Sequence, residues 1–149
     1  MKKFLKISLS TLLIIGIAGF TGFYIWSQQT YEASGELSAY VDMDEVGLED
    51  NWLIFEPSER TKSGIILYPG AKVEPEAYSY YAQVLAENGY SVIIPKVNLN
   101  FAIFDINQAE LIMEAFSDIE NWFVGGHSLG GVAAASYAYD NLDNVEGII

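Results

Sequence analysis

A Gly-x-Ser-x-Gly pentapeptide at 126–130 makes Ser128 the strongest candidate for chemistry in the chain. An apolar run at 122–126 precedes the serine, and a small-residue stretch at 128–141, typical of a helix, contains it. Glycines two residues either side let the backbone reverse sharply, because no Cβ blocks the neighbouring chain. The helix that follows aims its free N–H groups at the turn, where they stabilise an oxyanion. The pattern predicts that Ser128 is a nucleophile and that the Leu129 N–H is an oxyanion donor.

The same glycine-rich segment has two other interpretations. It can be a strand-to-helix turn that only packing requires. A phosphate-binding loop does not fit, because no lysine follows the glycines and the Gly-x-Gly-x-x-Gly register is missing.

A nucleophilic serine needs a base, usually a histidine that a carboxylate holds in place. The only histidine is His127. It is adjacent to Ser128, and adjacent side chains diverge across a sharp turn. The acids that follow Ser128 are Asp140, Asp143 and Glu146, and the family resemblance described below implies that they follow the helix too closely to be the catalytic acid. We therefore expect that the acid and the histidine lie outside these 149 residues and that this chain alone has little activity.

Strand and helix patterns alternate along the chain. Strands are expected within 51–59, 63–70, 90–95, 122–126 and 145–149, and helices within 75–89, 105–116 and 128–141. This alternation predicts an α/β fold with a mostly parallel sheet and flanking helices. Sites in such folds form beyond the carboxyl ends of the strands, where 69–71 and Ser128 both fall.

Two expectations concern single side chains in these helices. Tyr78 and Tyr81 share a three- and four-residue spacing with Ala82 and Leu85, which predicts that both tyrosines face the core. Asp105 is positioned to cap the helix at 105–116.

The first thirty residues have the pattern of a membrane segment. Three lysines lie within the first six positions, and no charged residue follows until Glu32. Residues 7–26 would form a helix about 30 Å long, which matches a bilayer core. Aromatic residues gather at 23–26, where a membrane interface favours them. We predict an uncleaved signal anchor with the domain outside the cytoplasm; a cleaved secretory signal and a buried soluble helix are the alternatives.

Charge and composition exclude several classes of partner. All 20 acidic residues lie at or after Glu32, against four of the seven basic residues. Such a domain is expected to repel nucleic acid and anionic lipid headgroups. No cysteine is present, so disulfides and thiolate metal sites are excluded, and a single histidine argues against a histidine-rich metal site. We expect neither a metal nor a cofactor.

Residues 50–149 resemble the α/β-hydrolase family, and most of all a bacterial subgroup with two motifs. Tyr68-Pro69-Gly70 followed by Pro-Glu-Ala-Tyr at 75–78 is the first motif, and Gly-Gly-His-Ser-Leu-Gly-Gly at 125–131 is the second. The resemblance implies that the Ala71 N–H is the second oxyanion donor and that 94–104 lines the site. It also implies that the family's acid and histidine would follow later in a complete domain.

These inferences divide the chain into a signal anchor or transmembrane segment at 1–31, a polar stalk and lead-in at 32–49, and the N-terminal part of an α/β-hydrolase domain at 50–149. The expected function is esterase-like hydrolysis of a small ester-like substrate by a single-pass protein of the cell membrane. If the segment at 1–31 is cleaved, the protein is secreted instead. The alternatives are a non-catalytic membrane-anchored binding domain and a non-functional truncated product.

Overall fold

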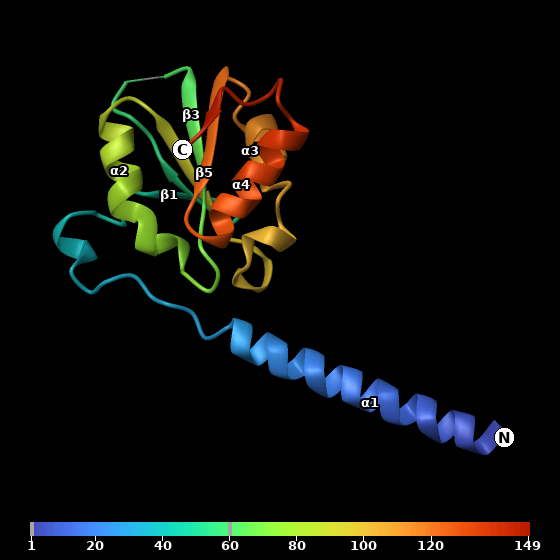
Figure 1. Ribbon diagram of the computed structural model, residues 1–149. Helices are drawn as coiled ribbons and strands as arrows, with labels where there is room; N and C mark the ends of the chain where they lie inside the picture. The colour runs from blue at the N-terminus through green and yellow to red at the C-terminus, as the bar shows by residue number, and fades with distance from the viewer. Residues whose placement is uncertain (1, 60) are drawn as a thin grey trace.

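A computed structural model describes residues 2–59 and 61–149, with side chains from Ser8 onward (Figure 1). The long helix α1 (Lys2–Ser27) projects from an α/β domain that holds the remaining elements. Within α1, Ser8–Ser27 is long and apolar enough to cross a membrane, with a mean hydropathy of 1.7. It is exposed from Ser8 to Gly22 and contacts the domain only near its end, where Ser27 is buried. This helix is therefore a candidate membrane span.

The domain contains every strand and helix that the sequence pattern predicts. The strands are β1 (Gly47–Glu49), β2 (Trp52–Phe55), β3 (Ser63–Tyr68), β4 (Ser91–Pro95), β5 (Asn121–Gly126) and β6 (Gly147–Ile148). The helices are α2 (Ser79–Glu87), α3 (Gln108–Ala115) and α4 (Leu129–Asp140), with 3-10 turns η1 (Leu37–Ala39), η2 (Pro75–Tyr78), η3 (Asn98–Asn100) and η4 (Ala102–Phe104). Strand β1 was not expected, because its residues are polar or exposed and carry no apolar run.

The six strands form one sheet in the order β1-β2-β4-β3-β5-β6. Strands β4, β3, β5 and β6 run parallel, and β1 and β2 add an antiparallel edge. The predicted α/β class with a mostly parallel sheet is confirmed. Strand β3 pairs with β5 along its whole length, ending with Tyr68 opposite Gly126. This register brings the segments that follow β3 and β5 to the same edge of the sheet.

Helices cover both faces of the sheet: α2 lies on one, and α3 and α4 lie on the other (Figure 1). Strand β2 shows why both faces are apolar. Trp52 and Ile54 pack in the core on the α3 and α4 side, while Leu53 and Phe55 pack on the α2 side. Successive strand residues point to opposite faces, so a continuous apolar run fits a strand that is covered twice.

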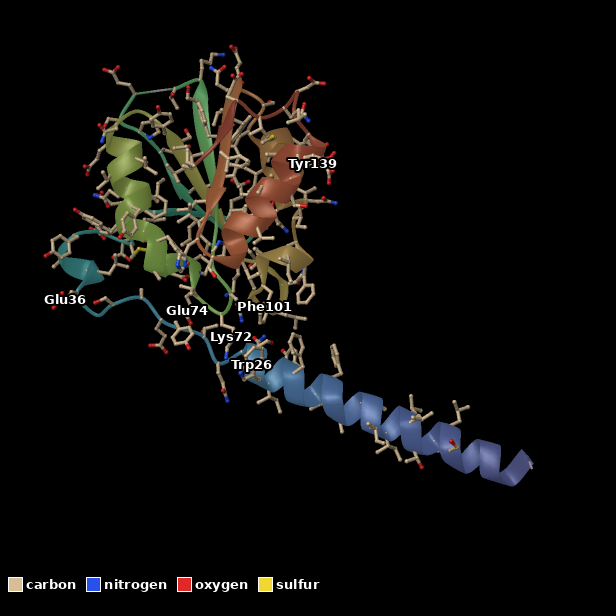
Figure 2. The ribbon with its side chains drawn as sticks, in the orientation of Figure 1. Trp26, Glu36, Lys72, Glu74, Phe101 and Tyr139 are labelled. Carbon is tan, nitrogen blue, oxygen red and sulfur yellow. The ribbon has the colours of Figure 1, made fainter. Side chains whose placement is uncertain are left out.

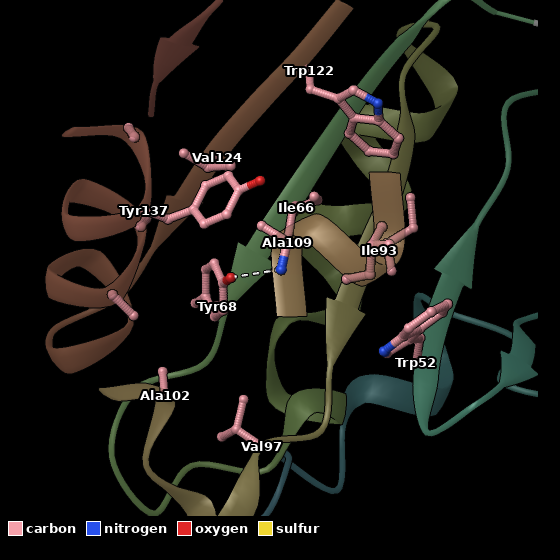
Figure 3. Packing of buried hydrophobic residues seen from close by; sticks show 14 of the residues in the cluster. Trp52, Ile66, Tyr68, Ile93, Val97, Ala102, Ala109, Trp122, Val124 and Tyr137 are labelled. Atoms are coloured by element: carbon pink, nitrogen blue, oxygen red, sulfur yellow. Dashed lines mark hydrogen bonds between the residues drawn. The ribbon is translucent and has the colours of Figure 1, made fainter. Parts of the chain in front are cut away.

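Tyr68 connects β3 to the start of α3 (Figure 3). Its hydroxyl oxygen accepts the Ala109 N–H at 2.9 Å, and its O–H donates to the Ile106 carbonyl. Burial raises the pKa of Tyr68, which keeps the phenol protonated and able to donate. One buried hydroxyl thus satisfies two backbone groups where the chain enters α3.

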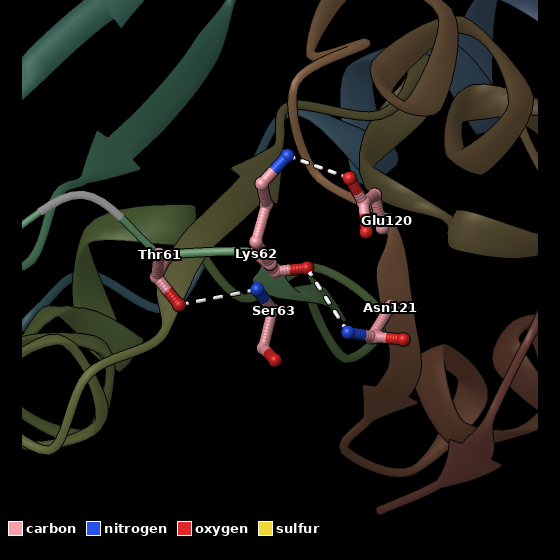
Figure 4. Close-up of polar contacts among 5 residues, drawn as sticks. All are labelled: Thr61, Lys62, Ser63, Glu120 and Asn121. Atoms are coloured by element: carbon pink, nitrogen blue, oxygen red, sulfur yellow. Dashed lines mark hydrogen bonds and ion pairs between the residues drawn. The ribbon is translucent and has the colours of Figure 1, made fainter.

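The opposite, amino-terminal edge of the sheet is fastened by polar contacts (Figure 4). The Lys62 carbonyl accepts the Asn121 backbone N–H at 2.9 Å, and the Lys62 ammonium pairs with Glu120 at 2.6 Å. Both charged side chains of this pair are exposed, so the ion pair itself contributes little to stability. The backbone bond is the contact that aligns β3 with β5 at this edge.

Two single-residue expectations were wrong. Tyr81 is 65% exposed, because residues 75–78 form a tighter 3-10 turn that changes the phase of the buried face. Asp105 does not cap α3, which begins after Asn107 without a side-chain cap. The Asp105 carboxylate instead accepts the backbone N–H and the side-chain amide of Asn98.

The segment assigned to the stalk and lead-in, 32–49, contains residues that pack on the domain. Val41 is buried against the α2 side of the sheet, and β1 pairs with β2. The sheet therefore begins before residue 50, and the division of the chain at residues 31 and 49 stays a prediction.

We expect Tyr68→Phe to lower the free energy of unfolding by about 1–3 kcal/mol, because it leaves the Ala109 N–H and the Ile106 carbonyl buried without partners. Tyr139→Phe is the matched control, since Tyr139 is 79% exposed. Urea unfolding followed by tryptophan fluorescence measures both variants. Equal stability of the two variants would show that the Tyr68 hydroxyl does not support the fold.

Candidate active site

Ser128 lies at the apex of the turn between β5 and α4, with φ of 53° and ψ of −119°. Residues other than glycine rarely adopt a positive φ, and holding one there costs about 1–3 kcal/mol. The Ser128 side chain is exposed. The chain thus keeps a serine in a strained conformation that displays its hydroxyl at the carboxyl edge of the sheet.

The glycines at Gly126 and Gly130 are needed because this turn packs directly against the end of β3. A Cβ on Gly126 would stand 2.7 Å from the Tyr68 carbonyl oxygen, and a Cβ on Gly130 would stand 2.7 Å from the Pro69 carbonyl oxygen. Both distances are too short for a side chain. The Gly-x-Ser-x-Gly spacing is therefore explained by backbone contact on both sides of Ser128.

Two polar groups at the turn have no partner in residues 2–59 and 61–149. The Ser128 hydroxyl makes no hydrogen bond there, and the Leu129 N–H donates none. The next N–H, on Gly130, donates to the His127 carbonyl at 2.8 Å. Leu129 is the first residue of α4, where N–H groups lack intrahelical acceptors. Its N–H is thus free to bind an anion beside Ser128.

The segment after β3 supplies a second free donor. Within the described part of the chain the Ala71 N–H has no acceptor, although its neighbours do: the Gly70 N–H donates to the Tyr78 hydroxyl at 2.9 Å, and the Lys72 N–H donates to the Asn100 carbonyl at 2.7 Å. Gly70 also packs closely on His127: a Cβ on Gly70 would lie only 3.3 Å from the His127 carbonyl oxygen. The Ala71 and Leu129 donors therefore come from two segments in contact.

Tyr78 has a role in the site that the sequence pattern did not reveal. Its hydroxyl accepts the Gly70 N–H and lies 3.1 Å from Nδ1 of His127. Burial raises the pKa of Tyr78, and the hydrogen bond from Gly70 partly opposes that rise, so the hydroxyl stays protonated at neutral pH. Helical spacing identified Tyr78 only as a core residue, and nothing in that spacing reports a bond to a loop eight residues earlier.

His127 is bound to Tyr78 rather than to the serine. Its ring contacts the Tyr78 ring, with centroids 6.1 Å apart, and no hydrogen bond joins it to Ser128 in the described residues. This supports the expectation that His127 is not the base. The described residues also contain no group of three or more His, Cys, Asp or Glu side chains that could hold a metal ion.

Comparison with known proteins assigns the family. The family model for the alpha/beta hydrolase family matches residues 64–149, more than half of the chain. No curated protein sequence matches. The chain therefore belongs to the alpha/beta hydrolase family.

Solved structures share the fold. A probable hydrolytic enzyme from Pseudomonas aeruginosa PAO1 is 23% identical, with a TM-score of 0.55 over 65% of this chain and 34% of that one. A structure reported for LipS and LipT, two metagenome-derived lipolytic enzymes, is 17% identical, with a TM-score of 0.56. The match covers 68% of this chain and 46% of that one. A thermostable carboxyl esterase from Bacillus coagulans is 16% identical, with a TM-score of 0.53. The match covers 69% of this chain and 41% of that one. The chain thus spans less than half the length of these structures.

Strain at Ser128 predicts an unusual order of stability among its variants. We expect the free energy of unfolding of Ser128→Gly to be about 1 kcal/mol higher than that of Ser128→Ala. Glycine adopts the positive φ without strain, whereas alanine stays strained there. Within the described part of the chain the serine hydroxyl has no hydrogen bond to lose, so both variants start from the same contacts. Parallel urea titrations measure the difference. A less stable glycine variant would mean that the turn is not strained.

Proposed function

We propose that this chain is the nucleophile-bearing part of a membrane-anchored serine hydrolase that cleaves acyl esters. The observation that carries the proposal is the strained, exposed Ser128, whose turn carries the Leu129 N–H and contacts the segment of the Ala71 N–H, both without an acceptor in the described residues. Membership of the alpha/beta hydrolase family supports hydrolysis in general. Packing explains the glycines and the positive φ of the turn, but a glycine at position 128 would meet the same constraint with less strain, so packing does not explain a serine there. This favours an enzyme over a binding domain that retained the same turn.

The proposed reaction proceeds by acyl transfer. The Ser128 hydroxyl oxygen attacks the ester carbonyl carbon while its proton passes to a histidine. The carbonyl oxygen becomes an oxyanion, which the Ala71 and Leu129 N–H groups stabilise by hydrogen bonds. The alcohol leaves with the proton from the histidine, and a water molecule then hydrolyses the acyl-serine in the same way. No metal or cofactor takes part in this scheme.

The histidine of this scheme and the carboxylate that orients it would come from outside these 149 residues. The single histidine of the chain, His127, contacts Tyr78. The solved hydrolases above are more than twice as long as the part this chain matches. We therefore propose that the catalytic acid and histidine belong to a further part of the domain, and that these 149 residues alone have little activity.

Helix α1 is proposed to anchor the enzyme in the cell membrane, with the domain outside the cytoplasm. The length and hydropathy of Ser8–Ser27 support a single span, and the lysines before it favour a cytoplasmic N-terminus. A cleaved signal would instead release the domain.

We expect Ser128→Ala to lower the hydrolysis rate of a short acyl ester by about a thousandfold or more in the full-length protein, because the attacking atom is removed. Ser136→Ala on the same helix is the matched control and should keep the wild-type rate, since Ser136 lies one to two turns beyond the N-terminus of α4. The rate is measured with a chromogenic ester in detergent. Equal turnover of the two variants would show that Ser128 is not the nucleophile.

We expect the mature protein to retain residues 1–31, because the apolar core is long and has no small-residue cleavage site. Intact-mass measurement of the protein purified from membranes gives the mass of the N-terminal peptide. A polypeptide that begins near Ala33 would instead show cleavage and secretion.

A further inference from the structure

The end of helix α1 packs against the loop that is expected to line the site. Phe101, between η3 and η4, stacks on Phe23 with ring centroids 5.9 Å apart and contacts Trp26 at 5.8 Å. Figure 2 shows Trp26 and Phe101 together at the junction of helix and domain. The domain is therefore held against the last turns of the candidate span.

Hydrogen bonds reinforce this aromatic contact. The Asn100 side-chain amide donates to the Ser27 carbonyl at 3.0 Å, and Ser27 itself is buried at the last turn of α1. Two residues of the loop, Asn100 and Phe101, thus contact the same end of the helix. A span whose end is fixed in this way sets the distance of the loop from the membrane.

The same contact reaches the proposed oxyanion donor through Lys72, the residue after Ala71. The Lys72 N–H donates to the Asn100 carbonyl at 2.7 Å, and the Lys72 carbonyl accepts the Tyr31 N–H at 2.6 Å. The Lys72 ammonium lies 4.1 Å from the centre of the Trp26 ring, a cation–π contact. The site and the helix end are therefore neighbours, linked through Lys72, and they share one edge of the domain.

Large apolar side chains remain exposed beside this junction. Ile103 and Phe104 on η4 are 38% and 52% exposed, and the Phe104 ring lies 5.9 Å from Phe101. Tyr24 and Trp26, on the last turns of α1, are also about half exposed. Tyrosine and tryptophan at the end of a span are typical of the membrane interface. Exposed apolar residues continuous with such an end favour the same surroundings.

The polar side chains around the junction suit a position at the depth of the lipid headgroups. Lys96 lines one hollow with Tyr24 and Gln28, so it places a cation beside the end of the span. Two carboxylates on this side of the domain have hydrogen-bond partners: Glu74 accepts from Thr30, and Asp105 accepts from Asn98. A cation next to exposed aromatics is typical of a membrane interface, and here it offsets locally the acidic charge that the domain carries elsewhere.

We propose that Ile103, Phe104, Tyr24 and Trp26 form one membrane-facing surface that rests in the bilayer interface and holds the mouth of the site at headgroup depth. This proposal rests on the proposed function. Its consequence is a substrate class: the enzyme acts on acyl esters of amphiphilic lipids in the same leaflet, whose ester carbonyls lie at that depth. Esters dissolved in water are reached only by diffusion and are poorer substrates.

Depth-dependent quenching tests the surface directly. The chain contains no cysteine, so Phe104→Cys and Tyr139→Cys each give one bimane label within these residues. Figure 2 shows Tyr139 at the end of the domain away from α1. The full-length protein is reconstituted in phosphatidylcholine–phosphatidylglycerol vesicles containing brominated lipid. We expect quenching of the label at 104 to exceed that at 139 by about threefold or more.

Equal quenching at the two positions would overturn the proposal. Quenching at neither position, with the label at 104 shielded only at high protein density, would show that a second copy of the chain covers the surface, and it would overturn the proposal too. This readout needs no catalysis, so it stands apart from the proposed function.

A second experiment tests the substrate class. Turnover is measured on umbelliferyl oleate embedded in the vesicles and on 4-nitrophenyl acetate in water. We expect Phe104→Asp to lower the ratio of the oleate rate to the acetate rate by about tenfold. A charged side chain at position 104 disfavours insertion into the bilayer interface, so the opening of the site no longer contacts the lipid. The control is Leu142→Asp, since Leu142 is 75% exposed and lies two residues beyond the end of α4. An unchanged ratio for Phe104→Asp would refute the substrate class, whereas a wild-type protein that hydrolyses neither ester would refute the proposed function instead.

Discussion

The structure of the candidate site depends on one close approach, between the β5–α4 turn and the end of β3. Gly126 and Gly130 lie so near the carbonyls of Tyr68 and Pro69 that neither position accepts a Cβ. The parallel register of β3 and β5 creates this approach by ending both strands at the same edge. Because the backbones touch there, Ser128 is forced to the outside of the turn and held at a positive φ. Strain at this residue is thus a consequence of packing and is available for function.

The segment at 69–72 connects this turn to the rest of the domain. Gly70 donates to Tyr78, which contacts His127 beside the serine. Lys72 is bound to the loop at Asn100 and to Tyr31, just beyond α1. The Ala71 N–H, which has no acceptor in residues 2–59 and 61–149, belongs to the residue between these two fixed neighbours, so its direction is determined on both sides. A site arranged in this way couples the proposed oxyanion donors to the end of the candidate span.

Much of the fold could be predicted because its signals are local. Consecutive apolar residues in β2, β3 and β4 predict doubly covered strands, and the glycine spacing around Ser128 predicts the turn. Contacts between distant segments could not be predicted. The bond from Gly70 to Tyr78, the exposure of Tyr81 and the pairing of Asp105 with Asn98 depend on how 3-10 turns set the phase of neighbouring elements. Strand β1 and the packing of Phe101 on α1 likewise follow from tertiary structure and leave no periodic pattern.

The most direct test of the central claim is the site of attachment of a fluorophosphonate in the full-length protein, because this reagent phosphonylates only an activated serine. Tryptic peptides of the labelled, membrane-reconstituted protein are mapped by mass spectrometry. We expect a single adduct on Ser128 and no adduct when the protein is denatured before labelling. Full-length, folded protein that stays unlabelled at Ser128 would contradict it, and the glycine-rich turn would then serve packing alone.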